Sequence, residues 1–185
     1  MEAAVLGEYF TKEEYYGMPE DVRSELIDGV MYDMASQERI HQGIVGELYY
    51  RIRDYIRNKG GDCKVYPAPF DVELFENEDT VVQPDISVIC DKEKLTKRGC
   101  QGAPDWVIEV ISPGNPGHDY VKKLNLYKRA GVREYWIVDP ANESVTVFIN
   151  SEDKEEPDYY TFSDEVKAGI YDDLSISFPE MVKEL

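Results

Sequence analysis

Apolar and polar positions recur with two different periods along this chain, and the changes of period predict its elements. Apolar residues at helical spacing through residues 37–59 predict one long amphipathic helix, closed by Gly60-Gly61. Strand candidates follow in the apolar runs CKVYPAPFDVELF, VVQPDISVIC and DWVIEVIS. A second helix, HDYVKKLNLYKRAG, ends at Gly131 and precedes the apolar strand REYWIVDP. The order helix, three strands, helix, strand predicts a mixed α/β layer structure.

The two ends of the chain add smaller elements. Near the N-terminus, TKEEYYGMPED predicts a short helix capped by Thr11, and SELIDGVMYDMA predicts a hairpin that turns at Asp28-Gly29. SVTVFIN should pair with REYWIVDP after a turn at residues 140–142. YYTF and LSISF in the acidic tail should lie at a sheet edge or in a terminal hairpin. Without repeats or linkers, residues 1–185 are expected to form a single domain, with a core at about 37–148 and an acidic β extension at 151–185.

One of the predicted strands carries a charge among apolar residues. In DWVIEVIS, Trp106, Ile108 and Val110 share one face, and the opposite face is apolar except at Glu109. Removing a carboxylate from water costs several kcal/mol. Glu109 could form a salt bridge inside the core, or lie at the exposed end of its strand. The third interpretation is that Glu109 belongs to a functional site.

A lysine of the second helix is also directed inward. At 100° per residue, the inward stripe contains Tyr120, Leu124, Tyr127 and Ala130, and Lys123 lies inside this stripe. Lys122, Lys128 and Arg129 point to the outer half of the helix and are candidate substrate contacts. The alternative for Lys123 is that its side chain extends past the rim of the core into water.

Asp85 is the third candidate, at the head of the apolar strand ISVIC. Pro84 before it fits a strand start or a bulge that aims the next side chain, although a Pro-Asp pair is more often a turn. Asp85 and Glu109 on neighbouring strands could hold Mg²⁺ or Mn²⁺, which favour oxygen ligands. Lys123 could then orient a water molecule or stabilise the pentavalent transition state of phosphodiester hydrolysis.

Composition and charge set limits on these hypotheses. The formal net charge of −18 repels phosphate backbones at long range and argues against avid, non-specific binding of nucleic acid. The sequence has no secretion signal and no apolar run of about 18 residues, which predicts a cytoplasmic protein without a membrane span. Cys63, Cys90 and Cys100 form no CxxC pair, so we expect reduced thiols and no cysteine zinc site.

Three longer motifs resemble a known family. PDISVIC, PDWVIEVISP and DYVKKLNLYKRAGVREYWIVDP resemble the Uma2 family of restriction-endonuclease-like proteins, formerly DUF820, in the PD-(D/E)xK nuclease superfamily. The resemblance covers about residues 10–140 and implies a restriction-endonuclease-like core with a divalent-metal site. By position, it makes Asp85 the PD aspartate and Glu109 the second acid. Ile111 replaces the superfamily's usual lysine, and Lys123 matches a lysine on the next helix that substitutes for it.

The same resemblance implies weaker candidates. Glu25 matches a recurring family glutamate and would be a further metal ligand, with a surface strand position as its alternative. His41 matches the family pattern, but a lone histidine near a helix start is more often a packing or capping residue. Asp71 in PFDVEL is a more distant candidate.

Two functions from different classes remain at this point. The first is a Mg²⁺- or Mn²⁺-dependent endonuclease that cuts DNA, expected to be a homodimer by analogy with nucleases that pair to cut both strands. The alternative is a nuclease-fold protein that no longer cuts and serves as a binding or regulatory module, which the net charge of −18 favours. Positive charge around Asp85 and Glu109 would support cleavage, and uniformly negative charge would support the alternative.

Overall fold

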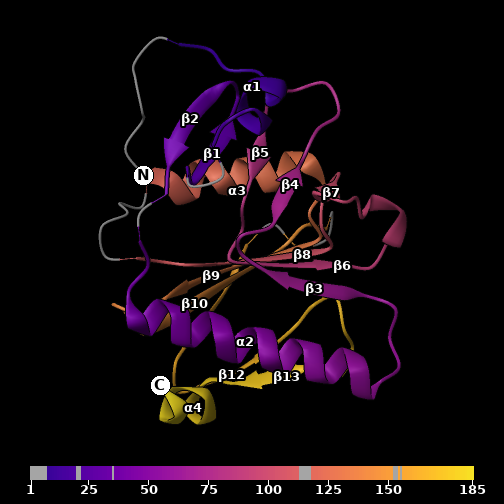
Figure 1. Cartoon of the computed structure of the whole chain (residues 1–185). Coiled ribbons are helices and arrows are strands. Elements are labelled where there is room, and N and C mark those ends of the chain that lie inside the picture. Colours follow the sequence, from indigo (N-terminus) through magenta and orange to yellow (C-terminus); the bar gives the residue numbers. More distant parts are fainter. Residues whose placement is uncertain (1–7, 20–21, 35, 113–117, 152–153, 155) are drawn as a thin grey trace.

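The computed structural model describes residues 8–19, 22–34, 36–112, 118–151, 154 and 156–185 (Figure 1). The helices are α1 (Lys12–Tyr16), α2 (Arg39–Asn58), α3 (His118–Ala130) and α4 (Phe178–Met181), with the 3₁₀ turns η1 (Lys92–Lys94) and η2 (Val182–Glu184). The strands are β1 (Ser24–Ile27), β2 (Val30–Asp33), β3 (Lys64–Pro67), β4 (Asp71–Glu73), β5 (Val81–Val82), β6 (Ile86–Ile89), β7 (Gly99–Gln101), β8 (Trp106–Val110), β9 (Glu134–Asp139), β10 (Ser144–Ile149), β11 (Asp158–Thr161), β12 (Glu165–Lys167) and β13 (Ser175–Ser177).

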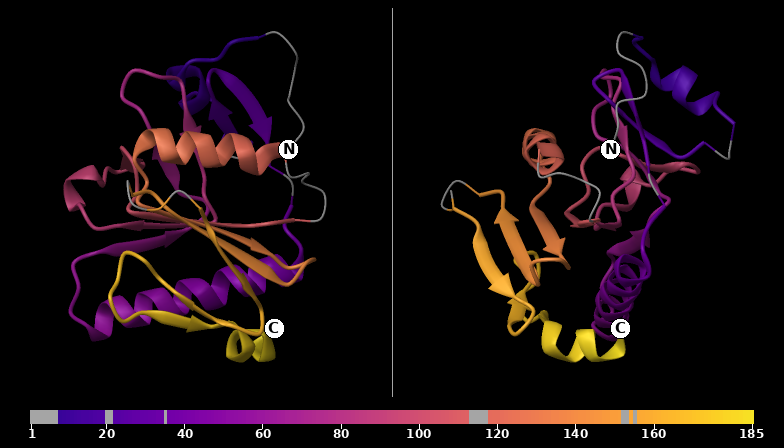
Figure 2. Two further views of the ribbon diagram at one scale, coloured as in Figure 1. Left: turned by 180° about the vertical axis from the view of Figure 1, so that it is seen from behind. Right: turned by 90° about the vertical axis from the view of Figure 1, so that its left-hand side faces the viewer.

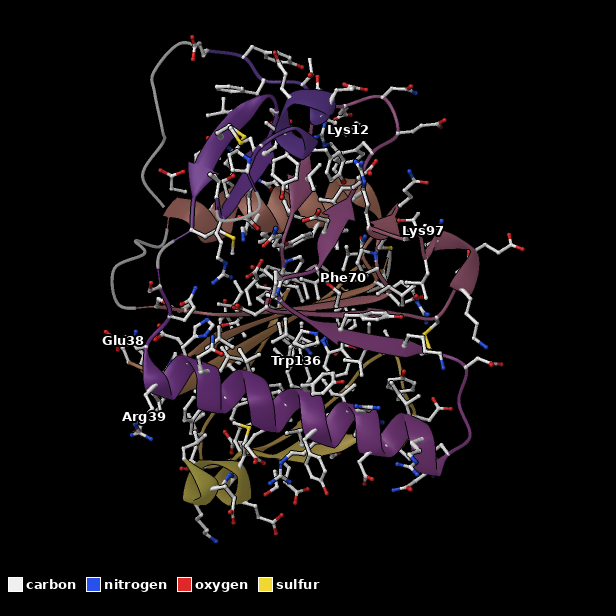
Figure 3. All side chains as sticks on the ribbon, viewed as in Figure 1. Lys12, Glu38, Arg39, Phe70, Lys97 and Trp136 are labelled. Atoms are coloured by element: carbon white, nitrogen blue, oxygen red, sulfur yellow. A yellow bond between two sulfur atoms is a disulfide. The ribbon has the colours of Figure 1, made fainter. Side chains whose placement is uncertain are left out.

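Two sheets and two long helices make up the layers. The larger sheet has the order β11-β10-β9-β8-β6-β3, and the smaller has the order β2-β1-β5-β4-β7. Helix α2 packs on one face of the larger sheet, and Trp136 lies in the layer between them (Figure 3). Helix α3 packs on the other face, where its apolar residues share one core with residues of both sheets. The predicted mixed α/β class is therefore confirmed.

Prolines divide two of the predicted strands. CKVYPAPFDVELF forms β3 and β4, and VVQPDISVIC forms β5 and β6, with one half of each run in each sheet. The breaks fall at Pro67–Pro69 and at Pro84, because proline has no N–H group to continue a sheet ladder. The chain thus crosses between the sheets twice, and the second crossing ends at Asp85.

Strand β7 was not predicted, because it is short and flanked by polar residues. It pairs in parallel with β4, and Gly99 lies opposite Asp71. A Cβ at position 99 would come within 2.0 Å of the carbonyl oxygen of Asp71, so only glycine fits there.

The helix and turn signals act as predicted. Thr11 caps α1, where its hydroxyl accepts from the Glu14 amide at 3.2 Å and the Glu14 carboxylate accepts from the Thr11 amide at 2.8 Å. Asp28 (φ 50°) and Gly29 (φ 76°) form the tight turn of the β1–β2 hairpin. Helix α2 begins at Arg39, two residues later than predicted, with Glu38 as its N-cap. Residues 113–117, which precede α3, lie outside the described residues, as does the Tyr120 side chain that the inward stripe contains.

The acidic tail completes the core on the α2 side. Strand β11 lies at the edge of the larger sheet next to β10, and β12 pairs with β13, as predicted. Val166, Ile176 and Phe178 pack in the same core as α2. Figure 2 shows α4 and the C-terminal strands at the same end of the molecule as α2. Within the described part of the chain, no helix combines the length and apolar character needed to cross a bilayer.

The prediction of reduced thiols is wrong for two of the three cysteines. Cys63 and Cys90 form a disulfide that joins β3 to β6. The antiparallel register pairs Lys64 with Ile89, and one further step places the two cysteines opposite each other. They are 27 residues apart and separated by β4 and β5, so only the strand pairing makes them neighbours. Cys100 is free and buried, and burial raises the pKa of its thiol to about 11.

Candidate active site

The fold brings Asp85 and Glu109 together at the neighbouring ends of β6 and β8, inside the larger sheet. Strands β6 and β8 are antiparallel with Ile86 opposite Ile108, so one further step places Asp85 opposite Glu109. Both side chains belong to residues that are almost inaccessible, at 8% and 7% exposure. The alternative that Glu109 lies at an exposed strand end is therefore wrong.

The Glu109 carboxylate contacts the described residues through one of its two oxygens. Its Oε1 accepts from the Tyr127 hydroxyl at 2.7 Å and from Lys123 Nζ at 2.9 Å. Its Oε2 accepts no hydrogen bond from the described residues. Burial raises the pKa of Glu109 above its ordinary value, the Lys123 ammonium lowers it, and the charges of Asp85 and Glu25 raise it, so that together they bring it to about 7. A cation at this position would therefore stabilise the ionised form.

Lys123 lies between two carboxylates contributed by different sheets. Its Nζ is 2.9 Å from Glu109 Oε1 and 3.0 Å from both oxygens of Glu25 on β1. Lys123 is buried, as its place in the inward stripe predicts, so the alternative that it extends into water is wrong. Burial alone would lower its pKa, but the two carboxylates raise the pKa above the ordinary value and keep the ammonium charged. Glu25 is 1% exposed, so its alternative as a surface residue is also wrong.

Asp85 is held from two directions. Its Oδ2 accepts from the Val110 amide at 2.8 Å and lies 3.1 Å from His41 Nε2. Because an ionised carboxylate can only accept, this ring nitrogen is the donor. His41 is 1% exposed, and its ring contacts the side chain of Asp85, a candidate metal ligand. Asp85 Oδ1 has no hydrogen-bond partner within the described part of the chain.

A network that the sequence did not reveal supports Glu25. The amide of Gln83 donates to Glu25 Oε1 at 2.8 Å, and its side-chain Nε2 donates to Asp71 Oδ1 at 2.9 Å. The Tyr15 hydroxyl donates to the same Asp71 oxygen at 3.1 Å. Asp71 is therefore linked to Glu25 through Gln83 and makes no hydrogen bond to Asp85 or Glu109.

Tyr127 could have been recognised as part of the site from the sequence. It lies in the inward stripe of α3 one turn after Lys123, and a buried tyrosine hydroxyl usually finds a hydrogen-bond partner. Gln83 carries no comparable signal, because its amide contact with Glu25 depends on how β1 and β5 pair.

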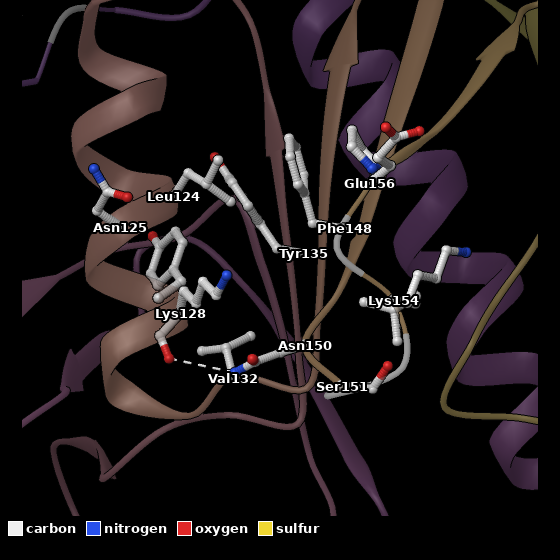
Figure 4. Close-up of a pocket in the computed structure, with 13 residues that line it drawn as sticks. Leu124, Asn125, Lys128, Val132, Tyr135, Phe148, Asn150, Ser151, Lys154 and Glu156 are labelled. Carbon is white, nitrogen blue, oxygen red and sulfur yellow. Dashed lines mark hydrogen bonds between the residues drawn. The ribbon is translucent and has the colours of Figure 1, made fainter.

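The three outward cations of α3 have separate contacts. The Lys122 ammonium lies 4.2 Å from the centre of the Tyr32 ring and donates to its hydroxyl. Arg129 pairs with Glu78 at 2.8 Å and lies over the ring of Phe75. Lys128 lines a pocket of about 160 Å³ between α3 and β10 (Figure 4).

The donor set fits a hard divalent cation that is shared with a substrate. Among the described residues, no group of three or more histidine, cysteine or acidic side chains is arranged to hold a metal ion. Asp85 Oδ1 and Glu109 Oε2 nevertheless remain available on neighbouring strands. Mg²⁺ is commonly bound by one or two carboxylates together with water molecules and substrate phosphates.

Comparison with known proteins agrees with this fold. The structure is similar to the crystal structure of "a putative nuclease belonging to DUF820" from Anabaena variabilis ATCC 29413, with a TM-score of 0.79 over 95% of this chain and 98% of that chain. At 21% identity this likeness concerns the fold. "Uncharacterized protein slr1290" from Synechocystis sp. (strain ATCC 27184 / PCC 6803 / Kazusa) is 26% identical over 144 residues, which are 76% of this chain and 74% of that protein. The Uma2 family model, described as "Putative restriction endonuclease", matches residues 12–177, beyond the 10–140 of the sequence resemblance. The chain therefore belongs to the Uma2 family.

Proposed function

We propose that this protein is a divalent-metal-dependent endonuclease that hydrolyses phosphodiester bonds in DNA. The observation that carries the proposal is the pair of available oxygens, Asp85 Oδ1 and Glu109 Oε2, beside the charged Lys123. A protein core without chemistry has little reason to place two acids side by side, each at most 8% exposed, with one oxygen of each free of hydrogen bonds from the described residues. The family description supports the same conclusion.

Each side chain of the candidate site has a separate role in this proposal. Asp85 and Glu109 would hold Mg²⁺ or Mn²⁺, with Glu25 as a further acid that holds Lys123 and could approach the metal. When bound, the metal polarises the phosphoryl oxygen and lowers the pKa of a water molecule. An ammonium has three N–H donors, and the Lys123 ammonium uses two of them on Glu25 and Glu109. The third can orient the attacking water or stabilise charge on the phosphoryl oxygens.

The surroundings of the site are part of the same proposal. Lys122, Lys128 and Arg129 would place positive charge along the outer side of α3, where DNA could be contacted. A homodimer would cut both strands of a duplex, and light scattering of the purified protein would give the mass that tests it. A DNA substrate also fits the predicted cytoplasmic location.

The decisive test is cleavage of plasmid and oligonucleotide DNA with Mg²⁺ or Mn²⁺. The wild type should cut, and Asp85→Asn, Glu109→Gln and Lys123→Ala should not. Calorimetry with Mn²⁺ should show weaker binding by Asp85→Asn and Glu109→Gln, with wild-type circular dichroism spectra as the folding control. Unchanged Mn²⁺ binding by Glu109→Gln would overturn the assignment of the metal ligand.

The second candidate is a non-cutting module with the same fold. The net charge of −18 favours it, as does the pairing of Arg129 with Glu78 and Asp28, which reduces the positive charge along α3. Failure of the wild type to cut single-stranded, duplex and branched DNA at low salt would support this second function.

A further inference from the structure

A groove leaves the candidate site on the side opposite α3. It lies between α2 and the Pro67–Pro69 turn after β3, holds about 370 Å³, and has Asp85 in its wall. Figure 1 shows α2 running alongside β3, and Figure 3 places Glu38 and Arg39 at the start of that helix and Phe70 just after the turn. A ligand in this groove would therefore reach a candidate metal ligand directly.

One face of α2 forms the long wall of the groove. Gln42, Gly46 and Tyr49 line it, and Arg53 follows at the same helical spacing. Arg53 Nη1 donates to the Tyr49 hydroxyl at 3.0 Å, and its guanidinium lies 5.8 Å from the centre of the Tyr49 ring. Arg53 therefore places a positive charge beside Tyr49, just beyond the residues that line the groove.

The charge of α2 differs from that of the whole chain. Between Arg39 and Asn58 the sequence has four arginines and two acidic residues, in a protein with a net charge of −18. Arg23 also lines the groove, is exposed, and has no ion-pair or hydrogen-bond partner for its guanidinium among the described residues. Two guanidinium groups and a tyrosine ring are the groups that bind phosphates and stack on bases.

We infer that this groove binds the DNA strand that leads to the scissile phosphate, with Arg23 and Arg53 on its phosphates and Tyr49 against a base. The inference rests on the proposed DNA substrate and assigns a strand path to it. Contacts to phosphates fix the position of the strand without reading its sequence. The groove therefore adds positive charge on the side of the candidate site opposite α3.

Gly46 allows a sharp test of this path. It is exposed in the groove wall, and a Cβ at this position would meet nothing within 4 Å. Glycine is also a poor residue inside a helix, by about 1 kcal/mol relative to alanine. Gly46→Phe should therefore fold as well as the wild type while its ring fills the groove. Asn58→Phe adds the same ring on another flank of α2, away from the groove.

Fluorescence anisotropy with a labelled single strand, in EDTA and again with Ca²⁺, would measure binding separately from cleavage. Gly46→Phe should raise the Kd at least tenfold, Gly46→Ala should raise it less, and Asn58→Phe should stay within twofold of the wild type. Arg23→Gln combined with Arg53→Gln should reduce the slope of log K against log salt by about 1.4, at about 0.7 for each single-strand phosphate contact. Thermal unfolding of each variant confirms that it is folded.

The outcomes separate this inference from the proposed function. An unchanged Kd for Gly46→Phe, with wild-type cleavage intact, overturns the strand path and leaves the nuclease assignment in place. Binding that Gly46→Phe weakens, without cleavage by any protein, keeps the path and removes the nuclease assignment. A wild type that binds no DNA in either buffer overturns the path. An RNA strand of the same sequence, bound tenfold more tightly than DNA, overturns the choice of DNA.

Discussion

Two buried glutamates on the larger sheet, Glu109 and Glu134, differ in how their carboxylate oxygens are hydrogen-bonded. Glu134 is completely inaccessible, and both of its oxygens are occupied. The indole of Trp136 donates to it at 2.6 Å, and the amides of Gly169 and Ile170 each donate at 2.8 Å. Glu109 accepts two hydrogen bonds on Oε1, and Oε2 accepts none from the described residues.

Burial alone does not distinguish the two residues, because it raises the pKa of both. At Glu134 the opposing influence comes mainly from neutral, fixed donors of the backbone and the indole, with a smaller contribution from the charge of Arg133. At Glu109 it comes from the ammonium of Lys123, while Asp85 and Glu25 act in the other direction. A carboxylate filled by neutral donors joins parts of the fold, whereas one that keeps a free oxygen beside charged groups can take a ligand.

The largest expected effect is on cleavage. Glu109→Gln should reduce Mg²⁺-dependent cleavage by about 10³-fold, since the metal contributes several kcal/mol to the transition state and each 1.4 kcal/mol is tenfold. Glu134→Gln, the matched substitution at the other glutamate, should stay within about threefold of the wild type. Equal losses in the two variants, measured as initial rates on one oligonucleotide, would remove the distinction between the glutamates.

The next effect is on stability at the site. Lys123→Met leaves Glu25 and Glu109 buried without their shared cation and should cost about 3 kcal/mol of unfolding free energy. Glu109→Gln should cost less than about 1 kcal/mol, because Glu25 and Lys123 remain as a neutral pair. Urea denaturation of both variants measures this order, and the reverse order would contradict the described charge balance.

A smaller loss is expected at Glu134. Glu134→Gln places an NH₂ group where amide N–H groups of Gly169 and Ile170 now donate, and unsatisfied buried donors should cost about 2 kcal/mol. Urea denaturation at neutral pH gives the value. If Glu134→Gln were as stable as the wild type, the filled carboxylate would have no structural role.

The smallest effect is a pH dependence of the same pair. Burial raises the folded-state pKa of Glu134 above 4.5, so between that value and the folded pKa the folded state holds a proton that the unfolded state has lost. The stability of the wild type relative to Glu134→Gln should therefore be greatest below pH 4.5 and fall as the pH rises through the folded pKa. Unfolding free energies of both proteins at pH 4 and pH 7 test the sign.

Local periodicity was enough to find part of the site. The period of two in DWVIEVIS marked Glu109, and the period of 3.6 in α3 marked Lys123, because each periodicity follows from one element alone. Pro84 marked the strand start at Asp85. The burial of Glu134 was not predicted, because it is the first residue of its strand, where a polar side chain is ordinary.

Contacts between distant segments could not be predicted from local periodicity. The pairing of β3 with β6, which joins Cys63 to Cys90, is set by how whole layers pack. The same holds for the division of two apolar runs between two sheets, and for the approach of His41 to Asp85. The groove beside α2 also depends on how distant segments pack, since one wall is a helix and the other is a proline turn.

The separation of Glu25 and Lys123 by 98 residues has a consequence for biosynthesis. While the ribosome is still making α3, the β1–β2 hairpin and both strands with Asp85 and Glu109 are already synthesised, but the ammonium that joins them is missing. The two sheets also meet through the apolar residues of α3, so Glu25 and Glu109 have no shared cation before this helix docks. A nascent or truncated chain that ends before Lys123 therefore lacks the cation that the two sheets share, and the charge balance of the candidate site is completed only when α3 has folded into place.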